Sequence, residues 1–234
     1  MSEPFIVTGQ LHDETLLKTI EKAGFQAVHV PVIETRPLTL SEVEIARITA
    51  CDWILFTSQT AVHAFFDQLE TPFTGKFAVV GSKTEKALQS HGYEASFKPS
   101  VYSADVFVEE WNASQPNDCR VGFVKGNLAK PTIEQGLHSS VDSVVVYETT
   151  SVPQNVLTIN DWIAQHYQVT LVFASPSAVR SYIQAGGAVT DKVIFCAIGH
   201  ITKKALEDAG MTVHVMPERY TLEDVVNARL HYKE

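Results

Sequence analysis

The chain repeats itself at about half its length of 234 residues, and this internal repeat limits the folds open to it more than any other feature. Residues 52–66 align with residues 169–183 at an offset of 117. Residues 77–111 align with residues 195–229 at an offset of 118, with ten identities in 35 positions. Chance pairing at average residue usage would give roughly 6% identity. The repeat predicts a tandem duplication of one folding unit.

Each half alternates short apolar runs with amphipathic stretches of ten to twelve residues, a pattern typical of βα units that build a parallel sheet. Five strands in each half predict a flavodoxin-like, doubly wound α/β domain. The expected strands are 5–8, 27–33, 53–57, 77–80 and 94–97 in the first half, and 121–125, 143–147, 170–173, 193–197 and 212–216 in the second.

Two matched stretches, near 33–38 and 147–153, follow the second strand of each half. Both carry a proline and β-branched residues but little apolar periodicity. We therefore expect them to be crossovers between two domains.

Composition excludes several classes of protein. The chain is 45% hydrophobic and 19% charged, as in ordinary globular proteins, which argues against disorder. A formal charge of -9 argues against a nucleic-acid partner. The sequence shows neither an apolar run of about 18 residues nor a signal peptide at its start, so we expect a soluble, cytoplasmic protein without a membrane partner.

Cysteine and histidine spacing predicts no metal site. Cys51, Cys119 and Cys196 are far apart, and each lies in or beside an apolar run, so we expect reduced core thiols. The closest two of the nine histidines, His200 and His214, are fourteen positions apart, and no His-x-x-x-His or His-x-His motif occurs.

The turns after the expected strands are rich in hydroxyls and glycines. In an open parallel sheet these turns form the edge where ligands bind, beside helix N-termini that present free N–H groups. One explanation for these hydroxyls and glycines is N-capping, which stabilises a helix by about 1 kcal/mol for each cap. The other is an anionic ligand, because these turns carry almost no acidic residue in an acidic chain.

Familiar catalytic motifs do not occur. Residues 75–84 resemble a P-loop, but the glycine spacing is wrong and a strand lies inside the supposed loop. No Gly-x-Gly-x-x-Gly or Gly-x-Ser-x-Gly motif follows a strand. Tyr147 differs from its repeat partner Ile33 at the end of an apolar strand. It is either a surface anchor or a functional group.

Nine segments in this order and spacing resemble the uroporphyrinogen-III synthase family. They are PVIETRPL, FTSQTAV, VVGSKTEKAL, YSADVFVEEW, VKGNLAKPTIEQGL, VVVYETT, FASPSAV, AIGHITKKALEDAG and PERYTLEDVV. The resemblance implies two flavodoxin-like α/β domains joined by a two-stranded linker, with a cleft between them. It also implies a discontinuous first domain, 1–33 plus 151–234, around a second domain, 36–146.

The resemblance implies a hydro-lyase that cyclises hydroxymethylbilane to uroporphyrinogen III, with loss of water and inversion of the terminal pyrrole ring. It implies no metal and no coenzyme, a monomer, and transient contact with hydroxymethylbilane synthase as a candidate interaction. Tyr147 is the candidate general acid for the departing hydroxyl. The implied substrate-binding residues are Thr57, Ser58, Gly81, Ser82, Thr84, Ser103, Gly126, Asn127, Ser175, Ser177, Gly199, Thr202 and Thr221.

A protein of charge -9 that binds a polyanion needs local positive fields. Helix N-termini each contribute about 0.3 to 1 kcal/mol, so six of them give roughly 2 to 6 kcal/mol, or about ten- to ten-thousand-fold in affinity. Two turns depart from the family pattern. Gly9-Gln10 replaces Arg-Pro after Thr8, and His200 replaces a frequent proline.

Two other classes remain open. Tandem α/β lobes also occur in non-catalytic solute-binding proteins and in effector domains of regulators. The absence of a signal peptide and of a basic helix-turn-helix segment argues against them. A nucleotide-sugar transferase with twin lobes is the second alternative, and the turns lack the acidic metal motif that it needs.

Overall fold

The computed structural model describes residues 2–11 and 14–232, which form two compact units. Unit 1 comprises residues 1–34 and 150–234, and unit 2 comprises residues 35–149. The ends of the predicted first domain, Met1 and Glu234, lie outside the described residues.

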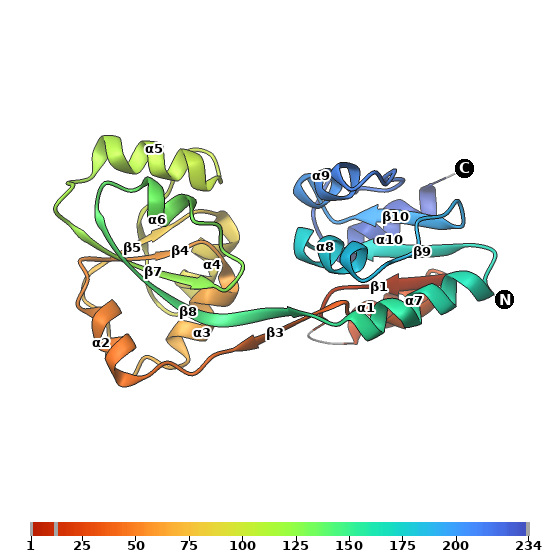
Figure 1. Ribbon diagram of the computed structural model, residues 1–234, viewed down its shortest axis with the longest axis horizontal. Coiled ribbons are helices and arrows are strands. Elements are labelled where there is room, and N and C mark those ends of the chain that lie inside the picture. The colour runs from red at the N-terminus through yellow and green to blue at the C-terminus, as the bar shows by residue number, and fades with distance from the viewer. Residues whose placement is uncertain (1, 12–13, 233–234) are drawn as a thin grey trace. The chain divides into compact units, whose positions relative to one another are not determined.

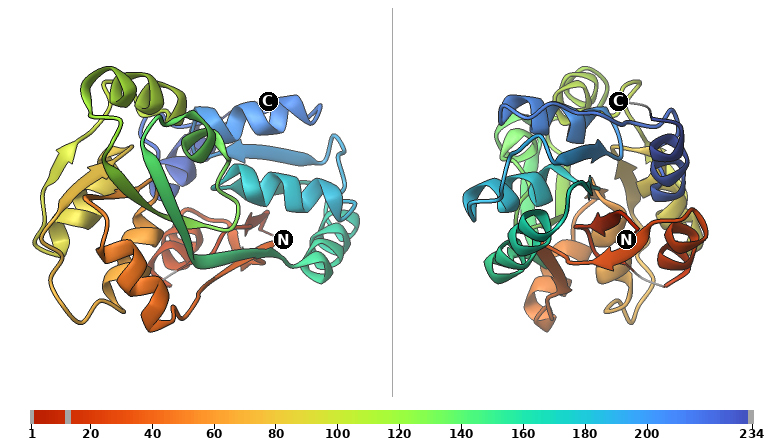
Figure 2. Two further views of the ribbon diagram at one scale, coloured as in Figure 1. Left: turned by 60° about the vertical axis from the view of Figure 1, so that its left-hand side comes forward. Right: turned by 90° about the vertical axis from the view of Figure 1, so that its right-hand side faces the viewer.

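Unit 1 is a parallel sheet of four strands, in the order β10-β9-β1-β2, with helices on both faces. The right panel of Figure 2 shows α1 and α10 on one face and α7 and α8 on the other. Its elements are β1 (Pro4–Val7), α1 (Thr15–Lys22), β2 (Gln26–His29), α7 (Pro153–Gln165), β9 (Val169–Phe173), α8 (Pro176–Gln184), β10 (Val193–Ala197), α9 (His200–Asp208) and α10 (Leu222–His231).

Unit 2 is a sheet of six strands, in the order β3-β8-β7-β4-β5-β6. In Figure 1, α5 and α6 cover one face, and α3 and α4 cover the other. Its elements are β3 (Ile33–Pro37), which begins in unit 1, α2 (Glu42–Thr49), β4 (Trp53–Phe56), α3 (Gln59–Phe66), β5 (Lys76–Val79), α4 (Ser82–Ser90), β6 (Ala95–Phe97), α5 (Ala104–Ser114), β7 (Arg120–Gly126), α6 (Thr132–Gly136) and β8 (Ser140–Ser151), which ends in unit 1.

Side chains alternate between the two cores of each unit. Phe5 and Val7 of β1 pack against α1 and α10, whereas Ile6 faces α7 and α8. Because successive side chains of a strand point to opposite faces, a strand buried on both faces is apolar throughout. This is why β1, β4 and β10 appear as continuous apolar runs in the sequence.

Each sheet combines strands from both halves of the chain. In unit 1, β1 and β2 of the first half lie beside β9 and β10 of the second. In unit 2, β7 and β8 of the second half lie beside β4, β5 and β6 of the first. With β3 left aside, the strand orders β2-β1-β9-β10 and β8-β7-β4-β5-β6 follow the same pattern, which is that of flavodoxin-like sheets. The predicted class, two parallel α/β units from a duplication, is confirmed.

The predicted crossover stretches are extended strands. In unit 2, the Leu38 N–H donates to the Val146 carbonyl at 2.9 Å. The Thr35 and Thr149 hydroxyl oxygens are 3.0 Å apart. The pairs run in opposite directions along the chain, so β3 lies antiparallel to β8. Backbone pairing explains a strand that apolar periodicity does not predict.

The expected strand at 212–216 is wrong as a full strand, because it forms a single bridge between Val215 and Cys196. The cause is His214, whose Nδ1 accepts the Phe195 N–H at 3.0 Å. A side chain thus takes a donor that a longer ladder would use. The segment still places Val215 in the core.

Repeat-related glycines end two equivalent helices. Gly92 follows α4 with φ +83°, and Gly210 follows α9 with φ +79°. Glycine adopts this left-handed conformation without the steric cost that a side chain brings. The next residues, Tyr93 and Met211, donate their N–H groups back to Leu88 and Leu206. The identity between the halves therefore preserves a helix stop.

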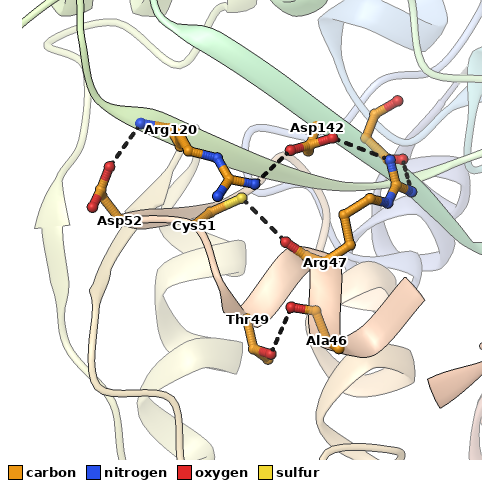
Figure 3. A network of polar contacts seen from close by, with 8 residues as sticks. Ala46, Arg47, Thr49, Cys51, Asp52, Arg120 and Asp142 are labelled. Atoms are coloured by element: carbon orange, nitrogen blue, oxygen red, sulfur yellow. Dashed lines mark hydrogen bonds and ion pairs between the residues drawn. The ribbon is translucent and has the colours of Figure 1, made fainter. Parts of the chain in front are cut away.

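A polar network ties α2 to β7 and β8 at the amino edge of the unit 2 sheet (Figure 3). Asp142 accepts from Arg47 at 3.2 Å and from Arg120 at 3.1 Å. The Asp52 carboxylate accepts the Arg120 N–H at 2.8 Å. The Cys51 thiol lies beside this network, and burial raises its pKa. Asp142 thus links two arginines from different elements.

The three cysteines are free thiols. Cys51 and Cys196 are buried as expected, and Cys119 is half-buried and packs against the core. Its thiol lies 3.3 Å from the Ser139 hydroxyl, at the margin of the core. In the part of the chain that the structure describes, no helix is long and apolar enough to cross a membrane.

Candidate functional site

Parallel pairing places the predicted site residues at the carboxyl edges of the two sheets, one set in each unit. The unit 2 set is Thr57, Ser58, Gly81, Ser82, Thr84, Ser103, Gly126, Asn127 and Tyr147, and the unit 1 set is Ser175, Ser177, Gly199, Thr202 and Thr221. The predicted cleft concerns the relation between the units and stays a prediction.

Tyr147 on β8 is half-buried, and its phenol oxygen lies 3.2 Å from the hydroxyl oxygen of Ser58. Its ring packs against Gly126 at the end of β7. A Cβ added at Gly126 would lie 2.3 Å from the ring carbon that carries the hydroxyl. Glycine at position 126 is therefore what allows the Tyr147 ring to occupy this place.

Asn127 holds the backbone around Tyr147. The pairing of β7 with β8 shifts register after Lys125, so that Gly126 lies opposite Tyr147. Beyond the shift, the Asn127 N–H donates to the Tyr147 carbonyl at 3.1 Å. The Asn127 side chain accepts the Thr149 N–H at 2.8 Å and donates to the Thr149 carbonyl at 3.2 Å. One side-chain amide thus continues the ladder past the irregularity.

Four of the predicted hydroxyls are helix N-caps, which confirms the capping explanation for them. The acceptor and donor pairs are Ser58 with Ala61 N–H at 3.1 Å, Ser103 with Asp105 N–H at 3.2 Å, Ser175 with Ala178 N–H at 3.2 Å, and Thr221 with Asp224 N–H at 3.1 Å. Each cap takes one first-turn N–H, and an α-helix begins with four such groups. Capping and ligand binding are therefore compatible at these turns.

The remaining predicted residues differ in accessibility. Gly81 and Gly199 are the N-cap residues of α4 and α9 and have no capping side chain. Thr84 and Thr202 are almost fully buried, at 4% and 3% exposure, so their side chains point into the units. The other residues are Thr57 and Ser82, which are half-buried, and Ser177, whose hydroxyl lies 2.9 Å from that of Ser175. Substrate contact stays a prediction for all of them.

Two residues at the unit 1 edge are absent from the predicted set. The Tyr220 hydroxyl lies 3.1 Å from Nδ1 of His200, the first residue of α9. Both side chains are exposed. The identities Tyr102/Tyr220 and Gly81/Gly199 between the halves mark this turn in the sequence. The contact itself joins residues 20 positions apart and needs the fold to be seen.

Cationic side chains accompany these turns in unit 2. Lys83 in the first turn of α4 and Lys130 after β7 are exposed. Lys125 binds Glu134 at 2.7 Å. Burial raises the pKa of Glu134, but the hydrogen bonds from Lys125 and Ser143 outweigh it, and the pKa lies below its ordinary value. Glu134 is therefore ionised at neutral pH and compensates the Lys125 charge.

Within residues 2–11 and 14–232, no group of three or more His, Cys, Asp or Glu side chains could hold a metal ion. Three surface hollows lie at the amino edges, opposite the turns described above. One is lined by Cys51, Asp52 and Lys76 of unit 2, and two adjoin Gln168 of unit 1.

The fold and these turns define a duplicated α/β protein whose hydroxyls, glycines and phenols gather at sheet edges that suit a small anionic ligand. The family model described as "Uroporphyrinogen-III synthase HemD" matches residues 14–227. The chain belongs to the uroporphyrinogen-III synthase family and is a lyase of tetrapyrrole biosynthesis.

Two curated relatives agree with this assignment. The chain is 29% identical to a putative uroporphyrinogen-III synthase of Methanothermobacter thermautotrophicus, over 91% of both chains. It is 26% identical to the uroporphyrinogen-III synthase of Chlorobaculum parvum, over 92% of this chain and 93% of that one.

Two crystal structures share the fold. A mutant uroporphyrinogen III synthase of Thermus thermophilus has a TM-score of 0.77 at 17% identity, covering 97% of this chain and 96% of that one. The Helicobacter pylori enzyme has a TM-score of 0.66 at 15% identity, covering 97% and 98%.

Proposed function

We propose that the protein converts hydroxymethylbilane into uroporphyrinogen III and water. The terminal hydroxyl leaves, the last pyrrole ring inverts through a spiro intermediate, and the macrocycle closes. The observation that carries the proposal is Tyr147, a phenol at the carboxyl edge of unit 2 with its ring against Gly126 and its hydroxyl beside Ser58. The family assignment supports the proposed reaction, and the geometry around Tyr147 supports its role as the general acid.

The first chemical need is a proton for the departing hydroxyl. The Ser58 oxygen accepts the Ala61 N–H at 3.1 Å, which leaves its own proton free to donate to the Tyr147 oxygen. The phenol proton is then available to a substrate oxygen. General acid catalysis of this kind typically accelerates a step by about 10² to 10⁴.

The second need is to hold a flexible polyanion in one conformation. Six helices, namely α3, α4, α5, α8, α9 and α10, begin at the carboxyl edges. Their first-turn N–H groups suit acetate and propionate side chains. Lys83 and Lys130 add exposed positive charge in unit 2. We propose that the predicted residues at the carboxyl edge of each unit bind carboxylates of the bilane.

The reaction needs no redox partner, because elimination of water and ring closure leave the oxidation state of the tetrapyrrole unchanged. We therefore propose catalysis without a coenzyme, by positioning and by one acid. We also propose that the protein is a monomer and that it is cytoplasmic. The three free thiols support the second point, because they suit a reducing compartment. Receipt of the bilane from hydroxymethylbilane synthase by transient contact belongs to the same proposal.

The test supplies bilane from a bilane-producing enzyme and measures which uroporphyrinogen isomer accumulates. The proposal predicts mostly isomer III with the protein and isomer I with the heat-denatured protein. Isomer I alone in both samples would contradict the proposal and favour a non-catalytic binding protein.

A further inference from the structure

The Tyr220 ring packs against Gly199, the N-cap residue of α9. A Cβ added at Gly199 would lie 2.9 Å from two atoms of the ring, closer than side chains approach. In this position the Tyr220 hydroxyl oxygen lies 3.1 Å from Nδ1 of His200, and the centres of the two rings are 5.5 Å apart. Tyr220 is still 42% exposed, so a ligand can reach its phenol.

This arrangement has the same parts as the one around Tyr147. In unit 2, a glycine at a strand end accommodates the Tyr147 ring, and the N-cap Ser58 contacts the phenol. In unit 1, the N-cap Gly199 accommodates the Tyr220 ring, and the next residue contacts the phenol. Both phenols lie at the carboxyl edge of their sheet.

The unit 1 arrangement is not a simple consequence of the duplication. The repeat partners of Gly199 and Tyr220 are Gly81 and Tyr102. A Cβ added at Gly81 would meet no described atom within 4 Å, so the Tyr102 ring does not lie on it. The position equivalent to His200 is Ser82. The packing of a phenol on the N-cap glycine, with an imidazole as its partner, is therefore specific to unit 1.

The chemistry of the pair suits a carboxylate. When the imidazole proton is on Nδ1, it donates to the Tyr220 oxygen, and the phenol proton is free to donate to an acceptor. The nearby acid, Asp224, is already engaged, because it accepts from Thr221 at 2.6 Å and from Arg219 at 3.0 Å. These contacts, that of Thr221 first, lower the pKa of Asp224. It therefore needs no proton from the pair.

We propose that Tyr220 binds an acetate or propionate carboxylate of hydroxymethylbilane and that His200 is the positioning residue that orients the phenol. This inference rests on the proposed function and adds a substrate-binding residue to it. Removal of the hydroxyl leaves the ring on Gly199, so Tyr220→Phe is expected to fold normally. It should raise KM about tenfold and leave kcat almost unchanged, because the phenol holds substrate and not the reacting atoms.

The test measures KM, kcat and the dissociation constant of an unreactive bilane that carries a methyl group in place of the terminal hydroxymethyl. His200→Ala should weaken binding in the same direction by a smaller factor. The double variant should bind no more weakly than Tyr220→Phe, because the imidazole acts through the phenol. Tyr167→Phe is the matched control at the opposite edge of unit 1, 92% exposed, and should bind like the wild type.

Two results would overturn the inference: unchanged binding by Tyr220→Phe, or fully additive losses in the double variant. A binding loss in Tyr167→Phe equal to that in Tyr220→Phe would also count against it. Failure of the proposed function is separate, because then the wild-type protein makes no isomer III. If the wild type makes isomer III and Tyr220→Phe binds normally, only the role of Tyr220 falls.

Discussion

The phenol oxygen of Tyr147 and the hydroxyl oxygen of Ser58 lie 3.2 Å apart, although 89 positions separate the residues in the chain. Ser58 also caps α3, so its oxygen is already an acceptor for the Ala61 N–H. The same hydroxyl can donate its proton to the phenol oxygen, which leaves the phenol proton for another acceptor. The helix cap and the proposed acid are parts of one contact.

Replacing Tyr147 with Phe tests the acid directly. The Phe ring keeps its packing against Gly126, so the free energy of unfolding should change little. Turnover should fall by about 10² or more, because the proton for the departing hydroxyl is lost. Steady-state kinetics, with urea unfolding as the control for folding, check both statements. An unchanged rate in a folded variant would exclude Tyr147 as the acid.

Gly126→Ala should displace the Tyr147 ring, since the new Cβ would lie 2.3 Å from its Cζ. We expect turnover to fall at least as far as in Tyr147→Phe, while stability falls by about 1 kcal/mol because the ring can swing outward. In a Tyr147→Ala background the same alanine should cost almost no further stability. An equal stability loss in both backgrounds would mean that the clash is with another group.

Asp142→Ala removes the carboxylate that two arginines share at the amino edge of unit 2 (Figure 3). We expect a loss of about 1 kcal/mol in the free energy of unfolding, because both ion pairs are partly exposed. Turnover of the folded enzyme should not change, since the network lies opposite the proposed site.

The control for this variant is Asp208→Ala. Asp208 is 62% exposed and makes one ion pair, with Lys204 on the same helix. It should lose about 0.3 kcal/mol or less. Urea unfolding measures both variants. A larger loss in Asp208→Ala than in Asp142→Ala would contradict the importance of the shared carboxylate.

The stability of the protein should fall in mild acid because of His91. Burial, followed by the charge of His63, lowers the pKa of His91 below 6.5, and Asp67 opposes the shift. The unfolded chain therefore takes up a proton at a higher pH than the folded chain. The His91 contribution is fully present above pH 6.5 and is lost as the pH falls through the lower, folded-state pKa.

His91→Phe should remove this part of the pH dependence, because phenylalanine does not titrate. The new ring can still stack on Phe66, whose ring centre lies 4.8 Å from that of His91 in the wild type. Urea unfolding from about pH 8 to about pH 5 compares the slopes of stability against pH. The wild-type slope should be steeper. Equal slopes would show that other groups cause the acid sensitivity.

The fold class followed from the sequence because buried parallel strands are apolar on both faces. Strands such as β4 and β10 therefore appear as continuous apolar runs. The ends of β8 did not follow, because the strand extends over Ser140–Ser151 and its outer residues are polar. Backbone pairing to β7 and β3, not burial, defines those ends.

The candidate site was predictable only in part. Tyr147 attracts attention because its repeat partner is Ile33, and the Ser and Thr caps follow from helix-start preferences. The contacts of Tyr147 with Ser58 and of Tyr220 with His200 depend on how distant turns meet at a sheet edge. A local sequence pattern does not contain that information. Only the structure shows that the Tyr147 ring packs against Gly126 and the Tyr220 ring against Gly199.

The most direct test of the account maps where the protein binds the unreactive methyl-terminated bilane, by ¹H–¹⁵N NMR. We expect saturable shifts of the first-turn amides of α3, α4, α5, α8, α9 and α10, and of Gly126 and Gly199. Saturable binding that shifts only amides at the amino edges, around Asp142 or Gln168, would contradict it.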